Sequence, residues 1–584
     1  MSGDKRVVLE GDDAIALWKQ GAGIWNAWVV SNPETDVSFE GVDFSDHIAD
    51  GDPVDFSAFR FPIGIIDFSN ARFGDRRVSF ADTVFNDGDV YFRRATFGDG
   101  DVSFRNAKIG VGRVTFQGAQ FGNGDVKFRH TSFGSGDVNF SSAIFARGNV
   151  DFGHTKFGSG EKLFIATDFG SGRVDFKKSI FSDGLVNFST SVFSRCEVVL
   201  FADISHGKGD FVFDTAFFGK QQVTFDRSIF GDGKVAFAKV NLTEVNLSFK
   251  KVTFGAEGVD FSDTQFGPNL VSFSGADFGA RAFSLETARF DRTLINFDYA
   301  LFGGLFNLLA GYNSGSLSIS MQNTKFQDSA NFDVLEAHHS PPLNLRNASF
   351  HGTLSISGYF TGIPDLRGSW TDHHVDLSRV HCTLSRHPIK LIREFLPLPF
   401  PADHPNLSLA GIACYLQGLA RRPTLVAADP QDSARLQRMK EIAANNHDHA
   451  AALRFGADEN RANRWINRSI PASLLDMAFS GICDYGQSIL RPALALLALM
   501  SLFTLTYFGM SVPGATAEQA AILSLGTSIG FLPGSGAIRE VALASLFGDG
   551  QPAGAIAVLT TLQATCSFIC IFLIGLGLRN RFRL

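Results

Sequence analysis

The sequence is poor in several residues whose abundance would point to a familiar class of protein. Its 584 residues include only 6 Cys, 5 Trp and 7 Tyr, and charged residues make up 19% of the chain. The cysteines are scattered without a C-x-x-C pair, so the sequence indicates neither a disulfide framework nor a zinc site. A net charge of -7 argues against a strongly basic nucleic-acid binder, and a hydrophobic content of 45% argues against disorder over most of the chain.

Common catalytic motifs are also missing. The sequence contains no P-loop, no G-x-S-x-G and no H-E-x-x-H. The histidines between positions 373 and 387 have spacings that match no common metal site. We therefore expect a protein that is not an enzyme and has no metal or cofactor. The N-terminal residues lack the basic and then apolar pattern of a secretory signal peptide, so the sequence does not indicate secretion.

Phenylalanine, in contrast, is abundant and periodic. The chain has 60 Phe, and pairs of Phe five residues apart recur every 12 residues through 12 consecutive units. A fixed period of this kind is typical of a stacked solenoid. The predicted core stack in the middle of this run comprises Phe92, Phe97, Phe104, Phe116, Phe121, Phe128, Phe133, Phe140 and Phe145.

Each unit reads V-x-F-x-x-(A/T/S)-x-F-G-x-G-x, with small variations such as Ile109 at the second Phe position of the unit that begins at Val102. Residues two apart on extended backbone share a side, so we expect Val, Phe and the small residue to face inward. The glycines are expected to supply the backbone freedom of a corner. Twelve residues would form a ring with a perimeter of only about 40 Å, too small to hold inward Phe side chains from every side. Two units should therefore form one coil, with roughly 10 coils between positions 56 and 302.

The A-x-F steps five residues apart resemble the pentapeptide-repeat family, strongly over 36–305 and weakly over 316–380. The resemblance implies a β-solenoid, specifically a right-handed four-sided β-helix with a Phe-stacked core. We expect a helical cap over 1–35, the 12-residue repeats over 36–305 and an irregular continuation over 306–387. Some family members mimic DNA and protect topoisomerases. Here cations interrupt any acidic stripe, so nucleic acid is not the expected partner: Arg72, Arg93, Arg94, Lys127, Lys177 and Lys178.

The C-terminal part of the sequence predicts helices and a membrane hairpin. A Pro-rich linker over 388–430 precedes a helical juxtamembrane region over 431–490, and 491–584 forms the hairpin. Ala493–Val512 and Gly554–Leu578 lack charge and are long enough to cross about 30 Å of hydrocarbon. Arginines flank them: Arg491 before the first, and Arg579, Arg581 and Arg583 after the second.

The arginine distribution predicts that both termini and the β-helix are cytoplasmic. The apolar run that ends in Leu-Arg-Asn-Arg-Phe-Arg resembles a bacterial subgroup of pentapeptide-repeat membrane proteins. The resemblance implies location in the bacterial inner membrane.

Between the two spans, residues 513–548 predict a re-entrant segment. Thr516 and Gln519 form a capping box for a short helix that should end at Gly526. An extended run should follow, made of Thr527, Ser528, Ile529, Gly530 and Phe531. This run is similar to a potassium filter, although Leu532 stands where a filter needs a second Gly.

These patterns lead to one main interpretation and two alternatives. The main one is a membrane-anchored scaffold that presents a rigid cytoplasmic β-helix to an unidentified protein partner. Its other partners would be the lipid bilayer and further copies of the chain, joined through the membrane segment. The alternatives are an oligomeric ion channel with a β-helical cytoplasmic domain and a DNA-mimicking protector of topoisomerases.

Overall fold

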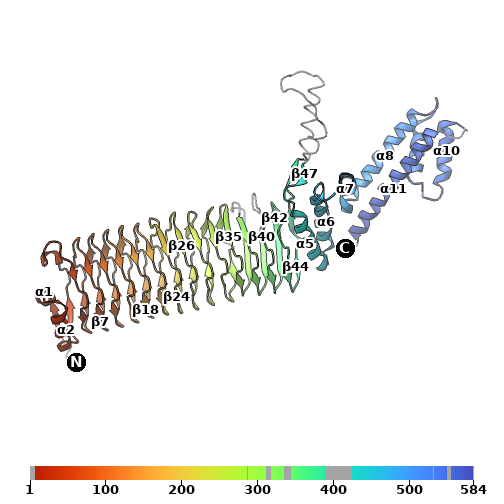
Figure 1. Ribbon diagram of the computed structural model, residues 1–584. Coiled ribbons are helices and arrows are strands. Elements are labelled where there is room, and N and C mark those ends of the chain that lie inside the picture. The colour runs from red at the N-terminus through yellow and green to blue at the C-terminus, as the bar shows by residue number, and fades with distance from the viewer. Residues whose placement is uncertain are drawn as a thin grey trace, which may run out of the picture. The chain divides into compact units, whose positions relative to one another are not determined.

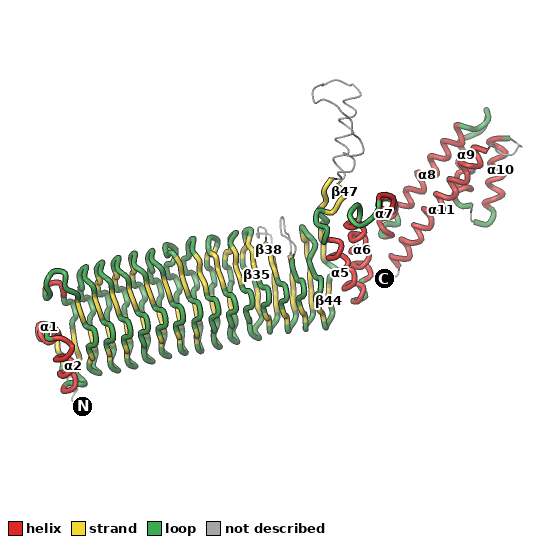
Figure 2. Tube along the Cα trace, viewed as in Figure 1, coloured by secondary structure: helices red, strands yellow, loops and turns green. Residues whose placement is uncertain are grey.

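The computed structural model describes residues 7–285, 287–310, 317–334, 343–388, 424–530, 532–548 and 554–582. The chain divides into two compact units, residues 1–383 and 384–584 (Figure 1), and each is described by itself. The first is built from short strands joined by tight turns, and the second is mostly helical (Figure 2).

Residues 8–382 form a β-solenoid of about 15 turns. Strands of successive coils pair in parallel, and Val102 is the register partner of Val126, 24 residues later. This spacing confirms that two 12-residue units make one coil. Each coil carries four strands, one for each side of the solenoid, as in the coil that contains β10 (Val102–Ser103), β11 (Lys108–Ile109), β12 (Val114–Thr115) and β13 (Gln120–Phe121).

The paired strands form continuous ladders along the solenoid. One ladder has 12 strands, from β3 (Val54–Asp55) to β38 (Leu317–Ser320), and another has 11, from β1 (Val8–Glu10) to β30 (Val259–Asp260). Of residues 306–387, expected to be an irregular continuation, the described residues up to 382 continue the coils with longer strands. There β40 (Ala330–Val334) pairs with β42 (Leu354–Phe360) over five residues in register.

The inward side chains form the core predicted from the repeat. Val102, Phe104 and Ala107 are buried, and the Phe rings of successive coils stack with their planes nearly parallel. Ring centroids lie 4.6 to 5.2 Å apart, with interplanar angles of 6° or less, in the pairs Phe92–Phe116, Phe97–Phe121, Phe104–Phe128, Phe116–Phe140, Phe121–Phe145 and Phe133–Phe157. Across the coil, Phe104 and Phe116 meet edge to face at 5.4 Å and 87°. Both geometries are favourable for aromatic rings.

The small inward position also accepts Thr or Ser because the hydroxyl finds a buried acceptor. Thr131 Oγ1 donates to the carbonyl of Phe104 at 2.7 Å, and Thr155 Oγ1 donates to Phe128 at the same distance. A buried hydroxyl without such a partner would be costly. The alternation of Ala, Thr and Ser in the repeat therefore leaves the core intact.

The corners differ from the sequence-based prediction. The left-handed backbone lies between the first Phe and the small residue, where Ala107 N donates to Phe104 O at 3.0 Å. The residue that adopts it is rarely Gly, with φ between 52° and 66° at Asn70, Asp82, Arg94, Asn106, Gly118, His130, Ser142, His154, Ala166 and Lys178. Hydrogen bonds to the neighbouring coil hold this corner, so a side chain is tolerated despite a cost of about 1 kcal/mol.

The glycines of the Gly-x-Gly segment have a different role from the one predicted. Most of them do not need a positive φ. A Cβ on Gly124 would lie 2.2 Å from the carbonyl oxygen of Gly100, and one on Gly148 would lie 1.8 Å from Gly124 O. The prediction of backbone freedom was therefore wrong for Gly124 and Gly148: glycine is favoured there because the stacked coils approach too closely for a Cβ.

Two short helices cover the first coils of the solenoid, α1 (Gly11–Trp18) and α2 (Gly21–Ser31). The ring of Trp18 stacks on Phe56 at 5.2 Å, and its Nε1 donates to the carbonyl of Asp55 at 2.9 Å. Trp25 is fully buried against Phe61 and donates to Arg60 O. Ile24 of the same helix is exposed.

The second unit begins with a two-stranded antiparallel sheet of β46 (Arg386–Pro388) and β47 (Thr424–Ala427). Most of the predicted Pro-rich linker, residues 389–423, lies outside the described residues. Six helices and one 3-10 turn follow: α5 (Asp432–Asn445), α6 (His449–Asn463), α7 (Ile470–Cys483), η2 (Asp484–Gly486), α8 (Leu490–Gly509), α9 (Ala517–Ser528) and α10 (Ser535–Phe547). The final described helix is α11 (Gly554–Phe582).

Candidate functional site

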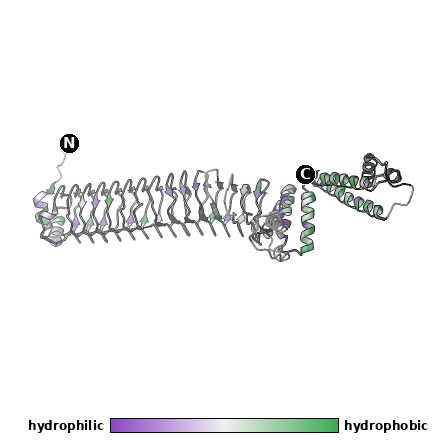
Figure 3. Ribbon diagram, turned by 90° about the horizontal axis from the view of Figure 1, so that it is seen from above, coloured by the Kyte–Doolittle hydropathy of each residue, from purple (hydrophilic) through white to green (hydrophobic). Residues whose placement is uncertain are grey.

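The helices α8 and α11 expose apolar side chains along their length. Both are long and apolar enough to cross a membrane. Large side chains on their outer surfaces are more than half exposed: Leu494, Leu497, Leu502, Leu505, Val558, Leu562, Phe568 and Phe572. In Figure 3 the helices that lead to the C-terminus are coloured as hydrophobic along most of their length. A helix in the core of a water-soluble domain would bury these side chains.

The interior of the same unit combines an apolar cluster, which includes Phe503, Leu523 and Leu546, with several buried polar side chains. Gln563 of α11 is fully buried, and its Oε1 accepts a hydrogen bond from the Tyr507 hydroxyl of α8 at 2.8 Å. Its Nε2 donates to the Ser524 carbonyl of α9 at 2.9 Å and lies 2.7 Å from Ser524 Oγ. Ser524 Oγ in turn donates to the carbonyl of Met500. One amide side chain therefore links α8, α9 and α11.

The polar core continues toward the end of α9. Ser528 Oγ lies 3.0 Å from Gln563 Nε2 and 3.0 Å from Ser567 Oγ, and all three side chains are buried. Thr527 Oγ1 is also buried, without a hydrogen-bond partner in the described part of the chain. Buried polar groups of this kind join helices when the surroundings offer no water. We define the polar core as Tyr507, Ser524, Ser528, Gln563 and Ser567.

Residues 513–548 agree with the prediction at their start and depart from it afterward. The capping box is present: Gln519 N donates to Thr516 Oγ1, and Thr516 N donates to Gln519 Oε1 at 3.0 Å. However, α9 does not end at Gly526 but continues through Thr527 and Ser528. A second helix, α10, then follows.

The prediction of an extended, filter-like strand was therefore wrong. Thr527 and Ser528 are helical, Ile529 caps the helix and Gly530 lies in a turn, while Phe531 lies outside the described residues. A potassium filter presents successive backbone carbonyls to the ion. In α9 the carbonyl of Leu525 instead accepts the hydrogen bond from Ile529 N. The segment packs the hairpin because its side chains enter the polar core.

Of the predicted membrane-flanking arginines, Arg491 lies in the first turn of α8, and Arg579 and Arg581 lie in the last turn of α11. Arg583 lies outside the described residues. Asn580 Nδ2 donates to Gly486 O at 3.2 Å, so the start of α8 and the end of α11 meet at one end of the hairpin. This end is rich in arginine, whereas the opposite end carries Glu518 and Glu540 with Arg539.

A buried charge network lies between α6 and α7 at this arginine-rich end. Asp476 of α7 accepts hydrogen bonds from Arg464 Nε at 2.8 Å, Arg468 at 2.7 Å and the Tyr485 hydroxyl at 2.8 Å. Burial, together with the Asp476 carboxylate, raises the pKa of Tyr485. Because every charged group in the network has a partner, it fixes α7 against α6.

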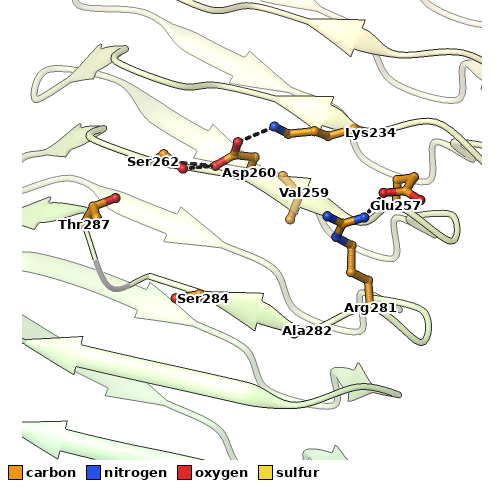
Figure 4. Close-up of a pocket in the computed structure, with 9 residues that line it drawn as sticks. All are labelled: Lys234, Glu257, Val259, Asp260, Ser262, Arg281, Ala282, Ser284 and Thr287. Atoms are coloured by element: carbon orange, nitrogen blue, oxygen red, sulfur yellow. Dashed lines mark hydrogen bonds and ion pairs between the residues drawn. The ribbon is translucent and has the colours of Figure 1, made fainter.

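A shallow groove with a volume of about 300 Å³ lies on the solenoid. Figure 4 shows its charged residues paired with one another: Lys234 Nζ lies 2.5 Å from Asp260 Oδ2, and Arg281 contacts Glu257. Although burial opposes ionisation, hydrogen bonds from Lys234 and Ser262 hold the pKa of the Asp260 carboxyl below its ordinary value. These mutual ion pairs tie adjacent coils together.

Two polar residues that the sequence analysis missed interrupt the solenoid core. Lys162 occupies an inward Val position between Val138 and Val186 and is almost fully buried. Its Nζ donates to the carbonyls of Ser182 and Asp183, and burial lowers the pKa of Lys162 to about 8. His206 takes the stacked Phe position next to Phe181, and burial lowers its pKa.

Both residues are visible as departures from the repeat, at positions where Val and Phe are expected. The polar core of the second unit gives a weaker signal, as Gln563 is a single amide in an apolar run. Across the described ranges, three or more His, Cys, Asp or Glu side chains nowhere gather closely enough to hold a metal ion.

Comparison with known proteins identifies no family for this chain. No protein-family model and no curated protein matches it. One matching solved structure is a mutant tailspike protein of E. coli bacteriophage HK620 in complex with a pentasaccharide. It is 12% identical, with 65% of this chain and 78% of that chain covered and a TM-score of 0.16. Neither fold nor function follows from so small a likeness.

Proposed function

We propose that this protein is a non-enzymatic scaffold, held at the cytoplasmic face of a bacterial inner membrane by its C-terminal helices. The observation that carries the proposal is the exposure of leucine and phenylalanine along α8 and α11, together with the burial of Gln563 and Tyr507 between the helices. Hydrocarbon favours this arrangement, because apolar side chains can face lipid while polar ones must find partners inside.

The arginines support a cytoplasmic position for the solenoid. Arg491, Arg579 and Arg581 lie at the end where the chain enters and leaves the hairpin. Cytoplasmic loops carry an excess of Lys and Arg next to membrane spans. The termini of the hairpin, and with them the preceding solenoid, are therefore cytoplasmic in this proposal.

The sides of the solenoid support a role in protein binding. They are rigid, because successive coils are hydrogen-bonded in register, and they carry both charges. Ion pairs join neighbouring coils at 2.7 to 2.9 Å in Arg113–Asp89, Lys127–Asp101 and Arg227–Asp203. Since cations alternate with carboxylates, the surface lacks the sustained negative stripe that DNA mimicry needs. We propose a pentapeptide-repeat-like β-helix of right-handed winding that binds a protein.

Membrane extraction tests the anchor. The full-length protein should stay in the membrane fraction after alkaline carbonate treatment. Substituting both Leu502→Arg and Phe568→Arg should strongly reduce this fraction, because each arginine would face hydrocarbon at a cost of about 2.5 kcal/mol or more. The matched control is Ile144→Arg with Phe217→Arg, two exposed apolar residues of the solenoid. If the parent and both double variants are all water-soluble and folded, the proposal is wrong.

Self-association through the membrane segment is the second part of the proposal. Helix α10 exposes Ile538 and Val541, and α9 exposes Ile522 and Leu525. These side chains can contact a second copy of the hairpin. The mass of the purified assembly in detergent tests this, and a strictly monomeric protein would exclude it.

A further inference from the structure

The helix α7 has an unusual distribution of side chains for a helix outside the two spans. Its inward face carries Asp476, Ser473 and Cys483, all buried. Its outward face carries Ile470, Leu474, Leu475 and Ala478, all exposed. The spacing of the two sets follows the helical period, so the exposed stripe is apolar throughout.

The inward face of α7 is held firmly by polar contacts. Asp476 binds Arg464 and Arg468, and the backbone N of Trp465 donates to Ser473 Oγ at 3.2 Å. Rotating α7 to bury its leucines would break these bonds and leave a charge without a partner. The exposure of Leu474 and Leu475 is thus a consequence of the buried network.

The place of α7 in the fold indicates what covers the leucines. Arg491, at the start of α8, contacts both the Ser480 carbonyl and Asp484 at the end of α7. Figure 3 shows α7 lying across the direction of α8 and α11, at the end of the hairpin where they meet. The plane in which a spanning helix leaves the hydrocarbon is where the headgroups lie.

The positive charge at this end of the hairpin also favours contact with anionic lipid headgroups. Residues 461–491 contain four arginines against two aspartates; Arg464 and Arg468 pair with Asp476, whereas Arg579 and Arg581 of α11 are exposed nearby. The guanidinium of Arg491 is half exposed although it pairs with Asp484. Each basic residue close to an anionic membrane surface contributes about 1 kcal/mol to binding.

From these contacts we infer that α7 is an interfacial helix. It lies in the headgroup region of an anionic phospholipid bilayer, with Ile470, Leu474 and Leu475 in the acyl boundary and arginines on the phosphates. The inference rests on the proposed membrane anchor, and it adds a second lipid contact beside the spans. It also fixes where the chain leaves the membrane surface, at the junction of α6 and α7.

Tryptophan quenching by brominated phospholipids tests the inference on the full-length protein in vesicles. Leu475→Trp adds a fluorophore to the exposed face of α7, and Gln437→Trp adds one to the exposed face of α5 as a control. The signal is the difference between each variant and the parent. In vesicles with roughly one third phosphatidylglycerol, shallow bromine labels should quench the emission added by Leu475→Trp at least twofold more than that added by Gln437→Trp.

The other outcomes separate the two proposals. Equal quenching for the two variants in a protein that resists carbonate extraction overturns the interfacial helix and leaves the anchor intact. A protein that is soluble and folded without lipid or detergent overturns both the membrane anchor and the interfacial helix. Replacing phosphatidylglycerol with phosphatidylcholine should lower the quenching of Leu475→Trp, and identical values in the two lipids would exclude the contribution of the arginines. Leu475→Glu, at an already exposed position, should leave the α-helical circular dichroism in detergent unchanged.

Discussion

The two units of this protein differ in which side chains they expose. The solenoid stacks Phe104, Phe116 and their equivalents inside and exposes charged side chains, whereas the hairpin exposes leucine and buries Gln563 and Ser524 beside an apolar cluster. The solenoid needs no polar side chains inside, because its backbone groups pair between coils. The hairpin joins three helices whose backbones are already satisfied, so side chains provide the specific contacts. Under the proposed membrane anchor, the exposed surface of the solenoid would meet water and that of the hairpin would meet lipid.

The largest effect is expected from the solenoid core. Phe116→Ala should lower the free energy of unfolding of the solenoid by about 3 to 5 kcal/mol, because it leaves a cavity between the rings of Phe92 and Phe140. Phe217→Ala, at an exposed position, should change it by less than about 0.5 kcal/mol. Chemical unfolding followed by β-sheet circular dichroism measures both. Equal losses would mean that the ring stack does not dominate stability.

The glycines provide a test of coil spacing. Gly124→Ala should destabilise the solenoid by about 1 to 3 kcal/mol, because the new Cβ meets the backbone of the previous coil. Gly118→Ala should cost less, even though Gly118 has a φ of +66°, because His130 and Ser142 adopt the same conformation one and two units further on. Melting temperatures of the two variants would show the order. If Gly118→Ala were the more destabilising of the two, backbone freedom would explain the glycines better than coil spacing does.

Lys162 is a charged exception in the apolar core of the solenoid, and it should make the stability of the solenoid depend on pH. Burial lowers the pKa of Lys162 to about 8, whereas an unfolded lysine titrates near 10.5. Below pH 8 Lys162 is charged in both the folded and the unfolded state, and the folded state bears the full free-energy cost of burying that charge. Between about pH 8 and 10.5 the folded state has lost its proton and the unfolded state has not, so stability rises with pH.

Lys162→Met should therefore raise the free energy of unfolding by about 1 to 3 kcal/mol at pH 7, and the gain should shrink toward zero as pH approaches 10.5. Urea titrations of parent and variant at several pH values measure this difference. A gain that does not vary with pH would mean that packing, and not charge, separates the two proteins. Lys177→Met, on the solenoid surface, is the control.

The smallest effect is expected in the hairpin. Gln563→Leu removes the amide that links Tyr507 and Ser524, and it should destabilise the hairpin by about 1 kcal/mol in detergent, since such bonds in membrane proteins are individually modest. Thr565→Val should have no measurable effect, because Thr565 Oγ1 contacts only the carbonyl of Thr561 in its own helix. Thermal unfolding of the helical signal distinguishes them. An unchanged Gln563→Leu variant would show that apolar packing alone holds α9.

Much of the solenoid could be predicted because its interactions are local and repeated. Each inward residue meets its equivalent 24 residues away, so the period of the sequence already states the register. The hairpin is different, since Gln563 and Ser524 are 39 residues apart and no period relates them. The end of α9 was mispredicted for the same reason: Gly526 is a common helix terminator, but contacts with α10 and the polar core extend the helix past it.

The sequence by itself determined the coil length, the inward Phe positions, the two apolar spans and the capping box at Thr516. Each of these depends on spacing along the chain or on the composition of a short segment. The tertiary structure decided why the glycines are needed, which corner residues turn left-handed, and which polar groups meet inside the hairpin. Those properties depend on how closely separate segments approach one another in space, which cannot be derived from any single segment of the sequence.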